Sequence, residues 1–548
     1  MTQSEPKPEF PYEIPVGKRS KRYRFFEILP GAVSWTVIFL PIILSFFNPT
    51  LAAWFVILFM AWWTMKAVTL SVRVVQGYRK LQRFLSVDWQ EKLDELDDLG
   101  HSLDHYKQRD NLSQMDEWHY ERMLEVASYG DDAPKSKDIY HAVFVAVANE
   151  TRDIVEPTIK SVIDSQYDTK KLMLVIAYEG RTGKQVEEMA KSLVHTYQHH
   201  FAHATAIKHP DGLPHEVIGK GPNISYAARK FEKYLNEQKI DPKNVLLTTL
   251  DADNRTHPSY FAHLTYIYIV TEDRKYKSFQ PIPMYTNNVW DAPAPSRVIA
   301  TGSSFWWIIQ AIRPHLLRNF SAHAQPMDAL IETDYWSTRS IVEDGHQFWR
   351  TYFRFDGKHD AIPLFVTIFQ DAVLAESLPK TLKAQFIQLR RWAYGASDIA
   401  YFAEYAFNGK SKIPLFDRIS KFLRLMEAHV SWATAPLILA FAAWTPILVN
   451  PDGRDSIIAH QLPLIASRIN TFIAAGILVT AFLTLKILPP RPPRYRAHRT
   501  VLMAAQWVLI PVTSILYGAV AALYSQTRLI LGKYLEVFDV TVKAVKKD

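Results

Sequence analysis

A long uncharged run near the amino terminus restricts the fold of this chain more than any other feature. No charged residue occurs in residues 28–65. As one helix this run would be roughly 57 Å long at 1.5 Å per residue, far more than the ~30 Å hydrocarbon core of a bilayer. Asn48-Pro49-Thr50 lies near its middle, where a turn would divide the run. We therefore predict a transmembrane hairpin over residues 28–75.

Basic residues flank this hairpin on both sides. Positive charge gathers on the cytoplasmic side of membrane spans, so both ends of the hairpin and the basic segment 1–27 are expected in the cytoplasm. A cleaved signal peptide is the alternative, but the run is too long and no small-residue cleavage site ends it. The flanking charges are Lys18, Arg19, Lys21, Arg22 and Arg24 before the hairpin, and Lys66 and Arg73 after it.

More apolar runs follow the polar middle of the chain and predict a transmembrane region over residues 428–531. Residues 430–451 and 469–485 each have the length of one span. The run 500–527 would be roughly 42 Å long as a helix, which is long for one upright span and short for two. A basic tail, residues 532–548, favours a cytoplasmic carboxyl terminus and an even number of crossings. We expect about five membrane-crossing elements in all, and the division of the last run stays open.

A short amphipathic segment, residues 413–427, precedes these runs. Its apolar residues recur at helical spacing while charged residues fill the other face, which is typical of a helix lying in the membrane interface. An ordinary surface helix of the soluble domain is the alternative. The apolar positions are Phe416, Ile419, Leu423 and Met426, and the charged ones are Asp417, Arg418, Lys421 and Arg424.

Composition excludes several classes of function. The chain has no cysteine among its 548 residues, so disulfides, thiolate metal sites and cysteine nucleophiles are excluded. Its net charge is +8, from 63 Lys and Arg against 55 Asp and Glu. Because much of this excess stands beside apolar runs, it fits anionic membrane lipids as partners and not nucleic acid.

The pattern of the polar middle of the chain predicts an α/β domain. Residues 76–137 are charged and predict a helical linker, and from residue 138 strands alternate with helices. This alternation predicts a Rossmann-like domain with a mainly parallel sheet over residues 138–412. In such sheets ligands gather beyond the carboxyl ends of the strands. The predicted strands are 139–148, 172–178, 204–208 and 244–250, and the clearest helices are 185–197 and 223–235.

The first motif, Asp251-Ala252-Asp253, directly follows the predicted strand 244–250. Two carboxylates at a strand end can hold a divalent ion from one side. Mg²⁺ and Mn²⁺ prefer oxygen ligands, and Mg²⁺ keeps only one or two carboxylates when substrate phosphates complete its shell. A solvated turn is the alternative, and the position at a strand end favours a metal site formed by Asp251 and Asp253.

The second motif is Glu343-Asp344. A carboxylate here could act as a general base on an acceptor hydroxyl. Acidic residues also stabilise helix amino termini, and the motif alone does not separate these interpretations.

The third motif is Gln388-Leu389-Arg390-Arg391-Trp392. Arginine binds a diphosphate through paired charge-assisted hydrogen bonds. A tryptophan face can stack on a sugar ring, and Gln388 can bond to hydroxyls. Anchoring of Arg391 and Trp392 at the membrane surface is the alternative.

In this order, and between membrane spans, the motifs resemble the membrane-integrated family 2 glycosyltransferases, the group containing cellulose and hyaluronan synthases. The resemblance implies a GT-A-like cytoplasmic domain inserted between α-helical transmembrane segments. It implies that Asp344, beside Glu343, is the catalytic base. It also implies that Arg391 lies by the donor diphosphate, while Gln388 and Trp392 lie on the acceptor side.

Two further segments bear on the donor. Lys220-Gly221-Pro222-Asn223 resembles the family's segment beside the donor, which adds Lys220 to the expected donor contacts. Asp251 of the first motif is also expected to contact the donor. The family carries an Asp after its second strand that contacts the nucleoside, whereas this chain has Glu179 there. Glu179 is expected to take that role, so a uridine base is less firmly implied than the metal.

The expected protein is therefore a multi-pass enzyme of the cell membrane with a cytoplasmic catalytic domain. It would move a sugar from a nucleotide donor, UDP-linked by resemblance, to a glycan acceptor with inversion and couple this to export. One transfer to a lipid-linked acceptor is the alternative reaction. An inactive, transferase-like transporter or scaffold is the alternative of another class.

Overall fold

The structure is a computed structural model that describes residues 10–130 and 133–537. The predicted hairpin is present as α1 (Lys21–Phe47) and α2 (Pro49–Leu85). Asn48 makes the turn, because its side-chain oxygen accepts a hydrogen bond from the Leu51 amide at 3.0 Å, and Pro49 starts the second helix. With 37 residues, α2 is roughly 55 Å long and extends well beyond one bilayer core. Residues 1–9 and the tail lysines Lys543, Lys546 and Lys547 lie outside the described residues.

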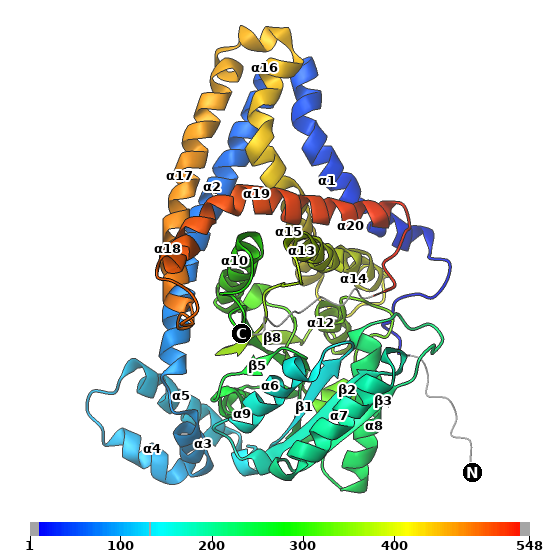
Figure 1. Cartoon of the computed structure of the whole chain (residues 1–548), viewed down its shortest axis with the longest axis vertical. Helices are drawn as coiled ribbons and strands as arrows, with labels where there is room; N and C mark the ends of the chain where they lie inside the picture. Colours follow the sequence, from blue (N-terminus) through cyan, green and yellow to red (C-terminus); the bar gives the residue numbers. More distant parts are fainter. Residues whose placement is uncertain (1–9, 131–132, 538–548) are drawn as a thin grey trace.

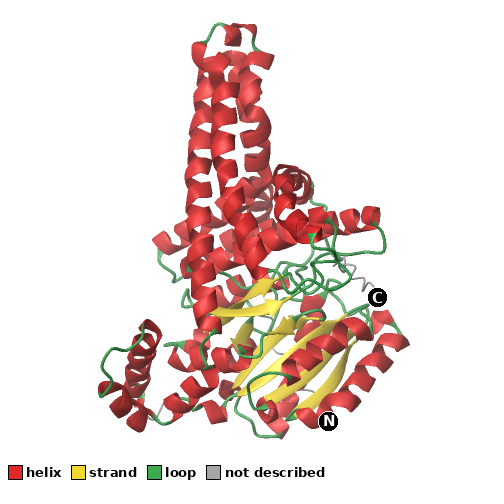
Figure 2. Ribbon diagram, turned by 60° about the vertical axis from the view of Figure 1, so that its left-hand side comes forward, coloured by secondary structure: helices red, strands yellow, loops and turns green. Residues whose placement is uncertain are grey.

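The described chain contains five helical stretches that are long and apolar enough to cross a membrane. The helices α1, α2, α15 (Leu415–Phe441) with α16 (Thr445–Val449), and α17 (Ile457–Ile487) stand together as an upright bundle. Figures 1 and 2 show this bundle projecting away from the sheet. Large apolar side chains on its outside are exposed, among them Phe46, Phe47, Leu58, Leu448, Phe472 and Leu478, as lipid-facing residues would be.

The remaining apolar stretch, residues 498–530, lies across the base of the bundle (Figure 1). We call it the transverse segment; it comprises α18 (His498–Ala505), α19 (Ile510–Thr513) and α20 (Val520–Ile530), with a π-helical turn at Ser514–Ala519. It is tied to the bundle by the Trp35 indole, which donates to the Thr527 hydroxyl at 3.0 Å. This orientation explains why its length fitted neither one upright span nor two.

Both ends of the described chain pack on the sheet domain. Near the amino terminus, the Glu13 carboxylate accepts a hydrogen bond from the Ser337 hydroxyl at 2.6 Å and pairs with Arg350. Near the carboxyl terminus, Ile218 and Val537 form a parallel β-bridge. The segments before α1 and after α20 therefore lie on the same side of the bundle as the sheet.

The segment 413–427 does not form a helix of its own. Its residues from Leu415 onward are the first part of α15, which continues without a break to Phe441. Phe416 is 85% exposed and Leu423 59%, whereas Met426 packs against a buried cluster that includes Phe348 and Tyr352, so only the first part of the apolar face is exposed.

The predicted linker 76–137 is helical. After the end of α2 it forms α3 (Trp89–Asp97), α4 (Leu99–Lys107) and α5 (Gln114–Ser128). The fully buried Trp89 ring stacks on His263 of α9 (Tyr260–Val270), with ring centroids 4.1 Å apart. The linker is therefore packed onto the sheet domain through an aromatic contact.

An eight-stranded sheet forms the centre of the polar domain, with strand order β3-β2-β1-β4-β7-β6-β8-β5. Its parallel half matches the predicted strands: β1 (Tyr140–Val147), β2 (Leu172–Glu179), β3 (His203–His209) and β4 (Val245–Asp251). The other half is mixed, because β7 pairs antiparallel with both β4 and β6. It contains β5 (Arg255–Thr256), β6 (Lys277–Met284), β7 (Ala324–Pro326) and β8 (Asp360–Phe369).

Helices cover both faces of the parallel half. Side chains of α6 (Arg152–Ile163) and α7 (Lys184–Tyr197) pack with Val143 and Ile176 on one face. The long helix α8 (Lys220–Glu237) packs with Phe144 and Val175 on the other. Strands buried on both faces explain the near-continuous apolar runs in the sequence.

Several helices lie between this sheet and the transverse segment (Figure 1). They are α10 (Ala294–Ala311), α13 (Leu378–Ala393) and α14 (Asp398–Ala406), with α12 (Glu343–Arg354) closer to the strands, whereas α11 (Met327–Glu332) packs with α8 on the face of the sheet. The Ser525 hydroxyl of α20 donates to the Arg390 carbonyl of α13 at 2.7 Å. The helix that carries the third motif is thus joined to the transverse segment.

Candidate active site

Lys220 joins the first two sequence motifs. Its ammonium nitrogen lies 3.0 Å from an Asp251 carboxylate oxygen, 3.4 Å from Asp344 and 4.0 Å from Glu343. The Lys220 side chain is only 7% exposed. The end of β4, the start of α8 and the start of α12 therefore meet at one buried cation.

A tight turn after β4 holds the aspartates in place. The Asn254 side-chain oxygen accepts from the Asp251 amide at 3.0 Å, and the Asp251 carbonyl accepts from the Asn254 amide at 3.0 Å. The Asp253 carboxylate accepts from the Asp371 amide at 2.9 Å, and the Ser321 hydroxyl donates to Asp251 at 2.7 Å. Neighbouring loops thus fix both carboxylates of the first motif.

Gly221 lets α8 and α12 approach each other closely. A β-carbon at this position would lie 2.6 Å from the Ser337 carbonyl oxygen and 3.0 Å from the Glu343 β-carbon. No side chain fits at such distances, so glycine is required for Lys220 to reach the acidic residues.

The third motif faces the same group of charges. Burial lowers the pKa of the Arg391 guanidinium, and the nearby carboxylates of Glu343 and Asp251 act in the opposite direction. The Trp392 ring lies 6.3 Å from the Tyr285 ring. Gln388 is buried, and its side-chain oxygen accepts from Gln385 at 3.0 Å. Arg391 thus lies near the acids, with Trp392 on a neighbouring apolar wall.

The adjacent acids have different electrostatic environments. Burial and the neighbouring Asp344 raise the pKa of Glu343 to about 8, against the opposing effect of Lys220. The Glu343 side chain is 4% exposed, whereas that of Asp344 is 18% exposed. Burial also lowers the pKa of Lys220, but Asp251 and Asp344 outweigh it, so that this pKa is raised. Asp344 is therefore the acid that a substrate can reach.

Side chains that sequence reasoning missed complete the site. The His323 ring nitrogen lies 3.6 Å from the Asp344 carboxylate, and burial lowers the pKa of this imidazole. Ser321 binds Asp251, and Tyr285 lies beside Trp392. No local pattern marks these residues, because Ser321 and His323 lie in the loop before β7 and Tyr285 directly follows β6.

Glu179 stands apart from the Lys220 group. It ends β2, its side chain is 9% exposed, and it pairs with Arg181. Asn223 of α8 donates to the Ala177 carbonyl near the end of β2 at 2.9 Å. The carboxyl ends of β2 and β4, with β1 between them, therefore form one border of the candidate site.

The aspartates suit a divalent ion of the Mg²⁺ or Mn²⁺ type. No group of three or more His, Asp or Glu residues suited to a metal exists in the described ranges, so the protein alone offers no complete cage. A site built from Asp251 and Asp253 leaves positions for phosphate oxygens and water, which is the way Mg²⁺ is commonly held. Asp251 already contacts Lys220 and Ser321, but each carboxylate oxygen has further lone pairs.

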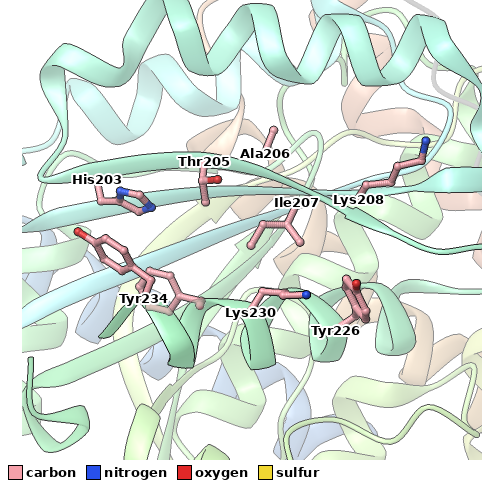
Figure 3. Close-up of a pocket in the computed structure, with 9 residues that line it drawn as sticks. His203, Thr205, Ala206, Ile207, Lys208, Tyr226, Lys230 and Tyr234 are labelled. Carbon is pink, nitrogen blue, oxygen red and sulfur yellow. The ribbon is translucent and has the colours of Figure 1, made fainter. Parts of the chain in front are cut away.

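A separate pocket of about 360 Å³ lies at the free edge of the sheet. Figure 3 shows it between β3 and α8, with His203 and Tyr234 at one end and Tyr226 at the other. The His203 and Tyr234 rings stack 3.8 Å apart. None of the predicted site residues lines this pocket, so it is distinct from the candidate active site.

No family model matches the chain, and no curated protein matches it. Among solved structures, it is similar to a mannosyltransferase from Pyrobaculum calidifontis in complex with GDP-Man and Mn²⁺, with 13% identity and a TM-score of 0.37 over 82% of this chain and 99% of that one. It is similar to S. aureus TarS 1–349 in complex with UDP-GlcNAc, with 9% identity and a TM-score of 0.33 over 72% of this chain and 93% of that one. A third similarity is to glucosyl-3-phosphoglycerate synthase from Mycobacterium tuberculosis with Mn²⁺, UDP and phosphoglyceric acid, with 16% identity and a TM-score of 0.29 over 53% of this chain and 82% of that one. These TM-scores are too low to assign chemistry by similarity, so the chemistry of the site depends on the residues of this chain.

Proposed function

We propose that this protein is a membrane-integrated, inverting glycosyltransferase that uses a nucleotide sugar. The observation that carries the proposal is the contact of Lys220 with both Asp251 and Asp344, with Arg391 close to the same acids. This arrangement unites a candidate metal ligand, a base and two phosphate-binding cations in one place.

The donor would lie beyond the carboxyl ends of β2 and β4. Lys220 and Arg391 supply positive charge for its diphosphate, and Arg391 offers paired hydrogen-bond donors. Asp251 and Asp253 would hold Mg²⁺ or Mn²⁺, and the ion, when bound, neutralises charge on the leaving diphosphate. Glu179 would contact the nucleoside. A UDP donor follows from the family resemblance alone.

Asp344 would act as the general base. It takes the proton of an acceptor hydroxyl as that oxygen bonds to the anomeric carbon of the sugar. The bond between this carbon and the diphosphate breaks on the opposite face, so the configuration inverts. Glu343, whose pKa of about 8 favours the protonated form at neutral pH, is less suited to this role.

The acceptor would enter from the side of Gln388 and Trp392, near the base of the bundle. The upright helices α1, α2, α15–α16 and α17 would cross the membrane and the transverse segment would lie at its surface. The polar domain would be cytoplasmic, because basic residues cluster at the ends nearest to it. Synthesis of a polysaccharide coupled to its export is the reaction that this layout and the family resemblance favour.

Two measurements test the proposal. Release of nucleoside diphosphate by the purified full chain, over a panel of nucleotide sugars with Mg²⁺ or Mn²⁺, identifies the donor; no release from any member would support an inactive transporter or scaffold. A gel of the products from a radiolabelled donor then shows chain length. A ladder of long products supports a synthase, whereas single-sugar adducts would support one transfer to a lipid-linked acceptor.

A further inference from the structure

A buried arginine lacks a counter-charge at the base of the bundle. Arg297, in the first turns of α10, is 4% exposed. Its guanidinium donates to the Gln506 side-chain oxygen at 2.7 Å and to the Ala292 carbonyl at 2.7 Å. Within residues 10–130 and 133–537, no carboxylate lies at ion-pair distance from it. Buried charges are normally paired, so this arginine calls for an anion.

A second guanidinium lies beside the first. Arg499 of α18 donates to the Trp290 carbonyl at 3.1 Å, two residues before the carbonyl that Arg297 contacts. Its side chain lies over the Tyr495 ring at 5.2 Å. The Arg499 Nε is buried and has no hydrogen-bond partner among the described residues. Burial, and to a lesser extent the nearby Arg499, lowers the pKa of Arg297 to about 10.

The position of Arg297 in its helix further disfavours its positive charge. The amino-terminal end of a helix carries partial positive charge, which disfavours a cation in the first turns. Neutral oxygens alone offset little of the repulsion between neighbouring guanidinium groups. A bound anion between Arg297 and Arg499 would remove all of these penalties together.

This arginine pair adjoins both the membrane elements and the expected acceptor side. Gln506 belongs to the transverse segment, and the Trp290 indole donates to the Pro489 carbonyl in the loop after α17 at 3.1 Å. Ala292 belongs to an apolar cluster with Tyr285 and Ala300, against which Trp392 packs. The residue whose carbonyl Arg297 contacts therefore belongs to the same cluster on which Trp392 packs.

We propose that Arg297 and Arg499 bind the phosphate group of a membrane lipid. The planar forks of arginine side chains match phosphate oxygens, and Gln506, which contacts Arg297, belongs to the segment that the proposed arrangement puts at the membrane surface. The phosphate could belong to a bulk anionic lipid or to a lipid-linked acceptor. Both sources rest on the membrane placement given with the proposed function, and the second also takes Trp392 as the acceptor side.

Lipid retention by the purified full chain tests this proposal. The protein in zwitterionic detergent is titrated with phosphatidylglycerol, with a polyisoprenyl monophosphate, or with phosphatidylcholine as reference, and bound lipid is measured by native mass spectrometry. We expect both anionic lipids, or the polyisoprenyl phosphate alone, to be retained above the reference. Arg297→Gln and Arg499→Gln should each weaken this retention about tenfold or more, as expected for loss of a charge-assisted contact.

Arg494→Gln is the matched control, because Arg494 lies in the loop just before α18 but pairs with Asp291 at 3.0 Å; lipid retention by this variant should equal that of the wild type. A preference for the polyisoprenyl phosphate would assign the site to a lipid-linked acceptor, and equal retention would assign it to headgroups. Retention no higher than the reference, or unchanged in both arginine variants, would overturn the proposal. Arg499→Gln keeps the test valid if Arg297→Gln fails to fold.

The same measurement on Asp344→Asn separates this inference from the proposed function. Lipid retention should persist in that variant, since Asp344 has no contact with the arginine pair. Lost turnover with retained lipid in this variant would support both proposals, whereas a wild-type protein that releases no nucleoside diphosphate but retains lipid through Arg297 would contradict only the proposed transferase activity.

Discussion

Glu343 and Asp344 are neighbours in the chain but have different surroundings. Glu343 packs against the Gly221 backbone and is nearly inaccessible, whereas Asp344 contacts Lys220 and lies near His323. Both stand in the first turn of α12, where acidic groups are favourable. The structural and catalytic interpretations of this motif are therefore compatible, because Glu343 is buried at the helix start while Asp344 is more exposed and can take the proposed role.

The first prediction concerns the pH dependence of stability. The pKa of Glu343 is raised from 4.5 to about 8 in the folded protein, so between these values the folded chain holds a proton that the unfolded chain has lost. The free energy of unfolding should therefore fall as pH rises through this window. Glu343→Gln has no carboxylate to ionise at this position, so its free energy of unfolding should not fall in this way. Near pH 8 it should exceed that of the wild type by up to a few kcal/mol. Melting temperatures from pH 5 to 8 check this, and parallel curves would contradict it.

The second prediction concerns metal-dependent donor binding. Asp253→Asn removes the charge but keeps an oxygen that can accept the Asp371 amide, so the fold should be retained. Donor affinity in Mg²⁺ or Mn²⁺ should fall about tenfold or more and should no longer respond to a chelator. Titration calorimetry with the active donor measures both effects. Wild-type affinity that is already insensitive to chelator would refute the metal site.

At the scale of elements, the site depends on how closely α8 approaches α12. These helices begin next to each other because Gly221 leaves room for the loop before Glu343. The Ser225 hydroxyl of α8 also donates to the Trp336 carbonyl at 2.8 Å. Lys220 and Asp344 are therefore positioned by the same contact between elements.

The third prediction tests this contact. Gly221→Ala should separate α8 from α12, lower stability by about 1–3 kcal/mol and reduce turnover about tenfold or more, since small displacements of catalytic groups are costly. Gly302→Ala is the control, because a β-carbon there meets nothing within 4 Å. Since alanine favours a helix more than glycine does, this substitution should raise the free energy of unfolding by up to about 1 kcal/mol. Equal activity of the two variants would show that the close approach is dispensable.

At the scale of the whole molecule, the transverse segment and the chain ends decide the membrane arrangement. Residues before α1 and after α20 contact the sheet domain, so the proposed membrane arrangement needs an even number of crossings between them. The upright helices α1, α2, α15–α16 and α17 give four crossings, which is an even number. A fifth crossing by residues 498–530 would make the number odd.

The fourth prediction follows from this arrangement. The chain has no cysteine, so single cysteines can be labelled without background. Val501→Cys and Leu531→Cys, at exposed positions near the two ends of the transverse segment, should react with an impermeant thiol reagent from the same side. Asp452→Cys, between α16 and α17, should react from the other side. Labelling of Val501→Cys and Leu531→Cys from opposite sides would show that the segment crosses the membrane.

Much of this arrangement could be predicted from local patterns. The turn at Asn48, the strands β1 to β4 and the helices α7 and α8 follow from uncharged runs, turn residues and strand–helix alternation. The mixed half of the sheet could not be predicted, because β5 and β7 have only two and three residues and depend on long-range pairing. His323 and Arg297 were also missed, because their roles come from burial and neighbours that no local pattern encodes.

Turnover by Asp344→Asn tests the central claim most directly. With the donor identified from the panel, release of nucleoside diphosphate should fall about a hundredfold or more, while the donor dissociation constant stays within about threefold. Asp334→Asn, at a surface ion pair with Arg229, should behave like the wild type. Equal release by Asp344→Asn and the wild type would contradict the assignment of this site as the centre of sugar transfer.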